Sequence, residues 1–261
     1  MEASAPIVVS RDGAIATVVL NRPQKLNALT RAMWASLGDA IEKLSSDDDV
    51  RCIILRGAGE KAFSPGNDIG EFERERSNKA QAIEYGKAMH TTADALWRCR
   101  HPLIAQIHGV CVGGGLEIAA LCDLRICGQS SRFGAPIKNL GLVMAYAEMT
   151  PLVQLVGASI ALEILLEGRI VDAHEAKDKG LVTRVVADAE VANEARATAQ
   201  RIAEGAPLAA RWHKKFARRL AEGRPLTDAE RDECFDCFDT EDFRRGYAAF
   251  IAKRKPEFVG R

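Results

Sequence analysis

The chain has 261 residues, of which 47% are apolar and 28% charged, enough to bury a full hydrophobic core. Its 36 basic residues balance 36 acidic ones at a pI near 7.0, which excludes the broad attraction to nucleic acid or anionic membranes that a basic protein has. The uncharged stretch from Met149 to Leu162 contains Pro151 and is shorter than the roughly 20 apolar residues of a membrane span. Seven cysteines in apolar contexts favour reduced, buried thiols. We therefore expect one large domain with a C-terminal appendage, in the cytoplasm, with no membrane partner.

The N-terminal part of the chain predicts two paired strands followed by a helix. Two apolar runs flank Asp12 and Gly13, a dipeptide suited to a tight hairpin turn. Apolar residues then recur at helical spacing from Met33 to Leu44, and Thr30 stands where an N-cap is expected.

Strands and helices alternate through the middle of the chain. The predicted strands are the β-branched runs VRCIILRG, PLIAQIHG, LRICG and GLVTRVV, and stretches of helical period lie between or around them. This pattern predicts βαβ units on a largely parallel sheet. The sequence DAHE at 172–175 predicts a capping box, Gly180 predicts the end of the same helix, and only helical patterns follow Ala187.

The segment 109–123, GVCVGGGLEIAALCD, places three glycines at the start of a predicted helix and one carboxylate, Glu117, in its first turn. A nucleotide-binding loop would need a lysine and a hydroxyl residue after the glycines, and a dinucleotide motif would need glycine in place of Ile118. Close packing of a strand and a helix stays open. An oxyanion hole is the third interpretation, because a glycine N–H at a helix N-terminus stabilises negative charge on a carbonyl oxygen.

A second loop strengthens the oxyanion-hole interpretation. The segment 60–72, EKAFSPGNDIGEF, passes through Pro65, Gly66 and Asn67, turn residues that expose backbone N–H groups. Two such loops can supply two donors to one oxygen.

Five segments in order resemble the motifs of the crotonase, or enoyl-CoA hydratase/isomerase, superfamily from about Ile7 to Arg261. They read NRPQKLNAL, KAFSPGNDI, HPLIAQIHGVCVGGGLEIAALCDLRI, RFGAPIKNLG and KRKPEFVGR. The resemblance implies an α/β fold, a spiral of ββα units in two packed sheets. Residues 1–195 are then the acyl-CoA-binding core, and residues 196–261 are a helical region that serves trimerisation.

The resemblance also implies the roles of particular residues toward an acyl-CoA thioester. Glu117 is expected to be catalytic, and the backbone amides of Asn67 and Gly114 are expected to bind the thioester oxygen as it becomes an enolate. Asn67 stands where the family usually has alanine. Lys25 is a candidate for a phosphate contact, and the last two residues of the following set are expected to reach the CoA of a neighbouring subunit. The expected substrate-binding residues are Lys25, Leu26, Ala28, Gly66, Asp68, Ile69, Gly113, Ile137, Lys255 and Phe258.

One departure from the family pattern limits the functional prediction. The resemblance implies a second hydratase glutamate directly after the proline of FGAPIKNLG, where this chain has Ile137. Isoleucine neither activates water nor delivers a proton, so hydration should be slow if Glu117 is the one retained carboxylate. Tyr146 or Glu148 can substitute if their loop bends inward, and the alternative for each is an ordinary surface or helix-start residue. The charged segment 71–90 is expected to form a lid over the acyl pocket.

Three functions remain open at this point. The first is an enzyme of enoyl-CoA hydratase/isomerase type. The second is a decarboxylase of malonyl-type CoA thioesters, since such members of the superfamily keep a glutamate at Glu117 and lack the second one. Those enzymes, however, carry histidine at the position of Asn67 and tyrosine at that of Met144. The third is a protein that binds acyl-CoA or RNA with little catalysis.

Other polar clusters suggest structure rather than chemistry. The histidines lack ligand spacing and CFDC at 234–237 has no partner pair, so we expect neither a metal nor another cofactor. Cys111 is expected to be a buried strand-end thiol. The aromatic stripe from Phe235 to Phe250 is expected to pack between subunits of a homotrimer or a dimer of trimers. The segment 211–220, RWHKKFARRL, predicts an amphipathic helix with a solvated cationic face, with RNA binding as its alternative.

Overall fold

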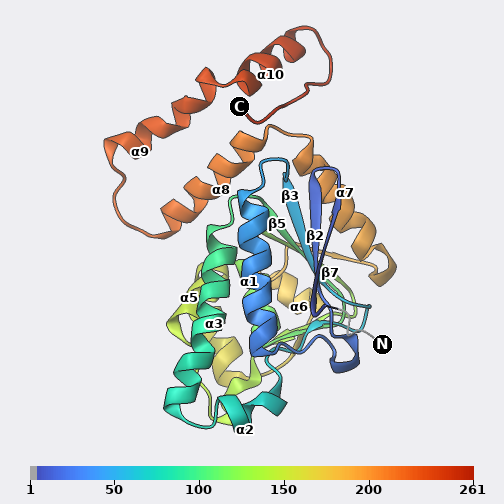
Figure 1. Ribbon diagram of the computed structural model, residues 1–261, viewed down its shortest axis with the longest axis vertical. Coiled ribbons are helices and arrows are strands. Elements are labelled where there is room, and N and C mark those ends of the chain that lie inside the picture. Colours follow the sequence, from blue (N-terminus) through green and yellow to red (C-terminus); the bar gives the residue numbers. More distant parts are fainter. Residues whose placement is uncertain (1–4) are drawn as a thin grey trace.

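The computed structural model describes residues 5–261, and its strands form two sheets (Figure 1). The larger sheet consists, in spatial order, of β1 (Ile7–Asp12), β2 (Ile15–Leu20), β3 (Cys52–Gly57), β5 (Leu103–Ile107), β7 (Leu124–Gly128) and β10 (Arg184–Val186). The smaller sheet consists of β4 (Ala62–Ser64), β6 (Val110–Val112), β8 (Arg132–Gly134) and β9 (Val171–Asp172). Neighbouring strands are parallel except for β1 with β2 and β8 with β9.

The chain order of the strands produces a spiral. Three successive pairs, β3 and β4, β5 and β6, and β7 and β8, each place their first strand in the larger sheet and their second in the smaller one. A helical segment follows each pair, so the fold is the expected series of ββα units. The α-helices are α1 (Arg31–Ser46), α2 (Phe72–Glu75), α3 (Lys79–Arg98), α4 (Gly114–Leu121), α5 (Tyr146–Glu167), α6 (Ala173–Asp178), α7 (Val191–Ala203), α8 (Pro207–Ala221), α9 (Asp228–Asp232) and α10 (Glu241–Ile251). The 3₁₀ segments are η1 (Pro23–Lys25), η2 (Ile69–Glu71), η3 (Pro136–Leu140), η4 (Asp188–Glu190) and η5 (Glu233–Asp239).

Local signals in the sequence correspond to these elements. The hairpin of β1 and β2 turns at Gly13, whose φ is +56°, and the Thr30 side chain accepts a hydrogen bond from the Met33 N–H at the start of α1. Asp172 caps α6, but the Glu175 side chain pairs with Arg169 instead of completing the predicted capping box. The strands of the smaller sheet have two or three residues each, too few for a period to be recognised in the sequence.

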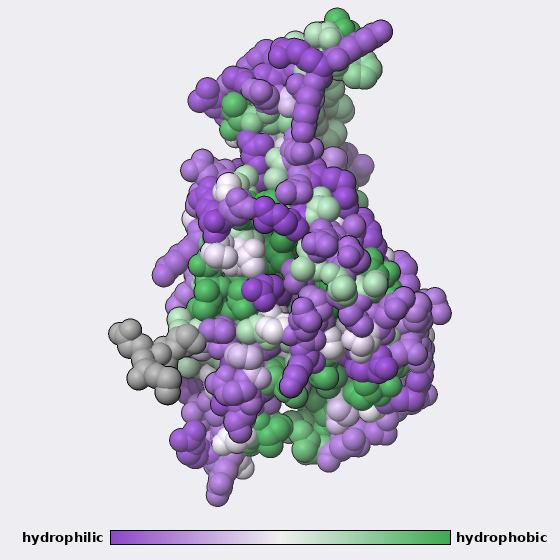
Figure 2. Space-filling view, turned by 90° about the vertical axis from the view of Figure 1, so that its right-hand side faces the viewer, coloured by the Kyte–Doolittle hydropathy of each residue, from purple (hydrophilic) through white to green (hydrophobic). Residues whose placement is uncertain are grey.

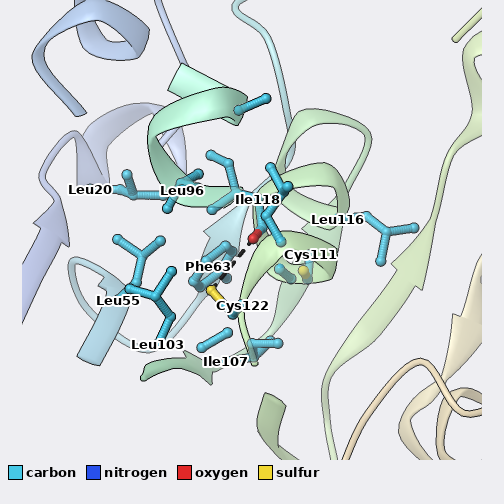
Figure 3. Close-up of a cluster of buried hydrophobic side chains, with 14 of the residues drawn as sticks. Leu20, Leu55, Phe63, Leu96, Leu103, Ile107, Cys111, Leu116, Ile118 and Cys122 are labelled. Carbon is cyan, nitrogen blue, oxygen red and sulfur yellow. Dashed lines mark hydrogen bonds between the residues drawn. The ribbon is translucent and has the colours of Figure 1, made fainter. Parts of the chain in front are cut away.

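In the main hydrophobic core, α4 packs on β4 and β6 and against the helices α3 and α5. Figure 3 shows part of it, with Phe63 from β4 close to side chains of α4. The Cys122 thiol donates to the Ile118 carbonyl oxygen at 3.5 Å, and burial raises the pKa of Cys122 to about 12. Cys111 is buried in β6 and burial raises its thiol pKa as well, which confirms the prediction of a buried strand-end thiol.

The prediction of a solvated cationic face on α8 is wrong. The Asp123 carboxylate lies 2.7 Å from Lys214 and 3.1 Å from Arg218, and the Lys214 side chain is only 7% exposed. Arg218 also stacks on the Trp97 ring at 4.6 Å. These partners lie far from α8 in the sequence, so the helix packs this face on the body of the protein. Few of its cations remain free for a nucleic-acid backbone.

The C-terminal elements form an arm that stands apart from the sheets (Figure 1). Figure 2 shows the arm as a lobe beyond a narrow waist, with apolar side chains exposed on the lobe and in a hollow below the waist. The predicted aromatic stripe is not one helix, because Thr240 ends η5 and caps α10. Its aromatic rings are nevertheless exposed, Phe250 to 80%. The domain boundary predicted between residues 195 and 196 lies within α7, which contacts β3, β5 and β7, and the division stays a prediction.

Helix α5 has the length and composition of a membrane-spanning helix. Gly157, however, has non-helical dihedral angles (φ 77°, ψ 162°) and divides it into two shorter helices. Neither part reaches the roughly 20 residues that a bilayer requires.

Candidate active site

A pocket of about 230 Å³ lies where the loop after β4 meets the N-terminus of α4. Its walls contain seven residues predicted from the sequence to be functional, which are Gly66, Asn67, Ile69, Gly113, Gly114, Glu117 and Ile137. The other lining residues are Pro65, Phe72, Arg76, Met89, Val112, Pro136, Leu140, Leu142, Val143 and Glu148. The pocket is therefore mainly apolar, with a small number of polar groups.

Two backbone amides at the wall of this pocket have no hydrogen-bond partner. Within the described part of the chain, the N–H groups of Asn67 and Gly114 donate to no acceptor. The two loops touch, since a Cβ added to Gly66 would lie 2.8 Å from the nitrogen of Gly114. Gly66 has φ +99°, a conformation that favours glycine. Because Gly66 has no side chain, the two loops can approach closely and bring the free N–H groups of Asn67 and Gly114 together.

The loop that contains Asn67 is held in place by the segment between η1 and α1. The Leu29 N–H donates to the Gly66 carbonyl, and the Asp68 N–H donates to the Leu29 carbonyl, both at 2.8 Å. The buried Ser64 hydroxyl accepts from the Gly66 N–H and donates to the Asn27 carbonyl. These bonds fix the direction of the loop around the Asn67 amide.

The glycine run serves close packing as well as the free amide. A Cβ added to Gly115 would lie 2.2 Å from the Ser64 carbonyl oxygen, so α4 approaches β4 too closely for any side chain there. Gly113 has φ +52° and directs the chain into the helix. The close-packing interpretation of the run is therefore confirmed, and the oxyanion-hole interpretation stays a prediction.

The side chain of Asn67 is anchored to the core. Its carbonyl oxygen accepts from the Trp34 indole N–H at 2.6 Å, and its amide nitrogen lies 3.7 Å from the Met89 sulfur. Since Trp34 is buried, the orientation of the Asn67 amide group is fixed.

Glu117 is a buried carboxyl group without a charged partner. It is 8% exposed and its Oε2 atom has no hydrogen-bond partner among the described residues. Burial and, to a smaller extent, the negative charge of Glu148 raise its pKa to about 8, and the nearby Arg76 opposes this rise. Glu117 is therefore protonated at neutral pH and has a proton to donate.

Of the two residues named as possible substitutes for the missing glutamate, Glu148 lines the pocket and brings a second carboxyl group to it. Glu148 stands in the first turn of α5, where its Oε2 atom accepts from the Ala145 N–H at 3.0 Å. Its Oε1 atom lies 3.6 Å from the His90 ring, and its side chain is 14% exposed. Tyr146 is 90% exposed and does not line the pocket.

Arg76 was not predicted as a site residue, although it lies in the segment expected to form the lid. It lines the pocket, with its guanidinium over the rings of Phe72 at 4.7 Å and Tyr85 at 4.9 Å. The sequence offered a charge-rich segment but no sign of which arginine turns inward.

The predicted CoA-loop residues Lys25, Leu26, Ala28 and Asp68 lie beside the pocket rather than in its wall. Lys25 is exposed at the end of η1. The hydrogen bond from Arg22 at 2.6 Å lowers the pKa of Asp68, and Arg22 also donates to the Ala28 carbonyl. This loop presents Lys25 to solvent, where an external phosphate can reach it.

The tail residues Lys255 and Phe258 lie away from the pocket of their own chain. Lys255 pairs with Glu204 at 3.0 Å, and the Phe258 carbonyl accepts from Arg51 at 2.6 Å. Their contact with the CoA of a neighbouring subunit stays a prediction. Among residues 5–261, no three or more His, Cys, Asp or Glu side chains are grouped to hold a metal ion.

The spiral of ββα units with its C-terminal helices defines a crotonase-fold protein of the acyl-CoA class. The family model described as enoyl-CoA hydratase/isomerase matches residues 10–261, and the chain belongs to that family.

Known proteins resemble the chain over almost its whole length. It is 34% identical to the short-chain-enoyl-CoA hydratase of Clostridium acetobutylicum over 96% of each chain. A crystal structure of an enoyl-CoA hydratase/carnithine racemase from Magnetospirillum magneticum superimposes with a TM-score of 0.97 at 50% identity, covering 99% of this chain and 97% of the other. The enoyl-CoA hydratase of Mycobacterium smegmatis gives a TM-score of 0.88 at 32% identity, with 97% and 99% covered.

Proposed function

We propose that the protein catalyses hydratase/isomerase-type chemistry on a short acyl-CoA, with the thioester oxygen held by the amides of Asn67 and Gly114. The observation that supports this most is the pair of free N–H groups beside the protonated Glu117 in one pocket. The pocket volume of about 230 Å³ is below the roughly 300–1,000 Å³ of sites for drug-sized ligands, which favours a short acyl group.

The two amides supply the main stabilisation in this proposal. When water adds to the β-carbon of an enoyl thioester, electrons move onto the thioester oxygen, and both N–H groups stabilise the resulting enolate. Loss of one such donor costs about 10²–10³ in rate. The CoA moiety then follows the loop of Lys25, Leu26 and Ala28 past Asp68 and Ile69.

The two carboxyl groups divide the proton transfers. Glu148 accepts the proton of the attacking water, and Glu117 delivers its own proton to the α-carbon of the enolate. Such assistance contributes about 10²–10⁴-fold. Glu148 thereby replaces the family glutamate that is absent at Ile137. No metal or cofactor takes part in these steps, and we place the enzyme in the cytoplasm.

Decarboxylation of a malonyl-type thioester is the second candidate, favoured by the protonated state of Glu117. Loss of carbon dioxide generates the same enolate without a base, and Glu117 then supplies the proton that the α-carbon needs.

Gly66→Ala tests the proposal, because the added Cβ would lie 2.8 Å from the Gly114 nitrogen and cover its amide. Gly59→Ala is the matched control: Gly59 also has positive φ, at +71°, but a Cβ there meets nothing within 4 Å. With crotonyl-CoA, we expect Gly66→Ala to lower kcat/KM by about 10²–10³ and Gly59→Ala to leave it near that of the unmodified enzyme. Thermal unfolding of both variants separates this loss from loss of folding.

Glu117→Gln should lower crotonyl-CoA hydration by about 10²–10⁴. Faster turnover of methylmalonyl-CoA than of crotonyl-CoA, with only a small loss in Glu117→Gln, would instead identify a decarboxylase. Equal activity of Gly66→Ala and Gly59→Ala would refute the two-amide site.

A further inference from the structure

The guanidinium of Arg76 is a cation in the pocket wall without an anionic partner. Within residues 5–261 no carboxylate lies within 4.0 Å of it and no acceptor receives its N–H groups. The neighbouring carboxylates are engaged elsewhere: Glu71 accepts from Tyr85 at 3.1 Å, and Glu75 lies 3.9 Å from Arg31. Glu148 shares the pocket with Arg76 but does not pair with it.

Two aromatic rings hold this guanidinium in place. Phe72 and Tyr85 lie 4.7 and 4.9 Å from it, and the Tyr85 ring is itself fixed by burial and by its hydroxyl bond to Glu71. Ring contacts occupy the faces of a guanidinium and leave the N–H donors at its edge available. Such an edge suits a carboxylate, which it binds through two parallel hydrogen bonds.

The remaining polar groups of the pocket are already assigned. The amides of Asn67 and Gly114 face the thioester oxygen, and the two glutamates handle protons. Arg76 has no role in those steps, and most of the other side chains that line the pocket, such as Ile69 and Met89, are apolar. Arg76 is half-buried, so a neutral hydrocarbon chain beside it would displace water from the guanidinium without supplying a partner.

We propose that Arg76 binds a carboxylate carried by the acyl group, so that the substrate is the CoA thioester of a short dicarboxylic acid. This inference rests on the proposed function, because it takes the thioester to sit at the two amides. The acyl chain then extends across the pocket from Gly114 to Arg76.

The experiment compares two unreactive thioesters, butyryl-CoA and succinyl-CoA, which differ only in a terminal methyl group or carboxylate. Isothermal titration calorimetry gives the dissociation constant of each. We expect the unmodified protein to bind succinyl-CoA at least as tightly as butyryl-CoA. Arg76→Gln should weaken succinyl-CoA relative to butyryl-CoA by about 10- to 100-fold, the range of a hydrogen bond to a charged group.

Arg74→Gln is the matched control, since Arg74 is exposed on α2, lies outside the pocket wall, and carries the same charge. It should leave the ratio of the two dissociation constants unchanged. If the unmodified protein binds butyryl-CoA more than 10-fold more tightly than succinyl-CoA, the inference is overturned. This outcome decides the matter even if Arg76→Gln does not fold.

Equal weakening of both thioesters by Arg76→Gln also overturns it, because Arg76 then contacts the shared CoA part. The proposed function fails separately, if butyryl-CoA does not bind and crotonyl-CoA is not converted. If the protein prefers butyryl-CoA but still converts crotonyl-CoA, only the dicarboxylic substrate is refuted and the proposed function stands.

Discussion

At the scale of single residues, the pocket contains two glutamates whose surroundings differ. Burial, together with the charge of Glu148, raises the pKa of Glu117 to about 8, whereas Glu148 accepts a backbone hydrogen bond at the start of a helix. A pair of carboxyl groups in unlike surroundings can act as acid and base in one reaction. The identity of a glutamate alone does not show whether it acts as the acid or as the base.

The pH dependence of the proposed hydration follows from Glu117. Because its pKa is raised, the group holds its proton below about pH 8 and loses it above. We expect kcat/KM for crotonyl-CoA to fall as pH rises through about 8, since kcat/KM reports the free enzyme and the step needs the proton. In Glu148→Gln, the residual activity should fall at lower pH, because the charge that raises the Glu117 pKa is gone.

Glu73→Gln controls for the change in net charge, since Glu73 is exposed and does not line the pocket. Its pH profile should match that of the unmodified enzyme. Activity that instead rises through pH 8 would show that Glu117 acts as a base.

At the scale of elements, the acidic residue Asp123 connects α8 to the larger sheet. Asp123 accepts from the Leu103 N–H at 2.7 Å and pairs with both Lys214 and Arg218. Burial lowers the pKa of Lys214, while Asp123 opposes that effect. Asp123 thus links α8 to the start of β5 at one end of the larger sheet.

Asp123→Asn should therefore destabilise the fold strongly. The Lys214 side chain is buried, and removing the partner of a buried charge costs up to about 3–5 kcal/mol. Asp228→Asn, at a fully exposed residue of α9, should change the free energy of unfolding by less than about 0.5 kcal/mol. Urea unfolding measures both, and adding Lys214→Met to Asp123→Asn should recover part of the loss. Similar losses of unfolding free energy in Asp123→Asn and Asp228→Asn would show that the ion pairs of Asp123 do not hold α8 in place.

At the scale of the whole molecule, the arm leaves aromatic side chains uncovered in a single chain. Phe238 and Phe243 contact each other at 4.8 Å, and Tyr247 stacks on Phe243 at 6.4 Å, yet all three are exposed. Exposed apolar surface of this kind is typical of protein interfaces. It supports the prediction of a homotrimer or a dimer of trimers, in which Lys255 and Phe258 can reach a neighbouring pocket.

Sedimentation velocity checks this assembly. The unmodified protein should sediment at micromolar concentration with the mass of three or six chains. Replacing both Tyr247 and Phe250 by serine should shift it to lower mass, whereas Val9→Ser, at an exposed residue of β1, should not. A stable monomer of the unmodified protein would contradict the prediction and remove the basis for a shared site.

The sequence by itself determined the features that depend on neighbours along the chain. Turn dipeptides, the Thr30 cap and the long β-branched runs predicted the hairpin, α1 and the larger sheet, because dihedral preferences and side-chain periods act over a few residues. Local sequence also predicted the loops that contain Gly66 and Gly114 and the position of Glu117 in a helix, because these features depend on neighbouring residues as well. Family resemblance supplied the two-sheet spiral, which short strands alone do not signal.

Only the tertiary structure decided which distant groups meet. Glu148 on α5 and Arg76 after α2 enter the pocket of Glu117 because helices from different ββα units pack around it. Lys214 and Arg218 of α8 face the rest of the fold rather than solvent because Asp123, far away along the chain, pairs with both of them. Burial and Coulomb interactions depend on distance in space, and a residue type gives no information about either until the chain has folded.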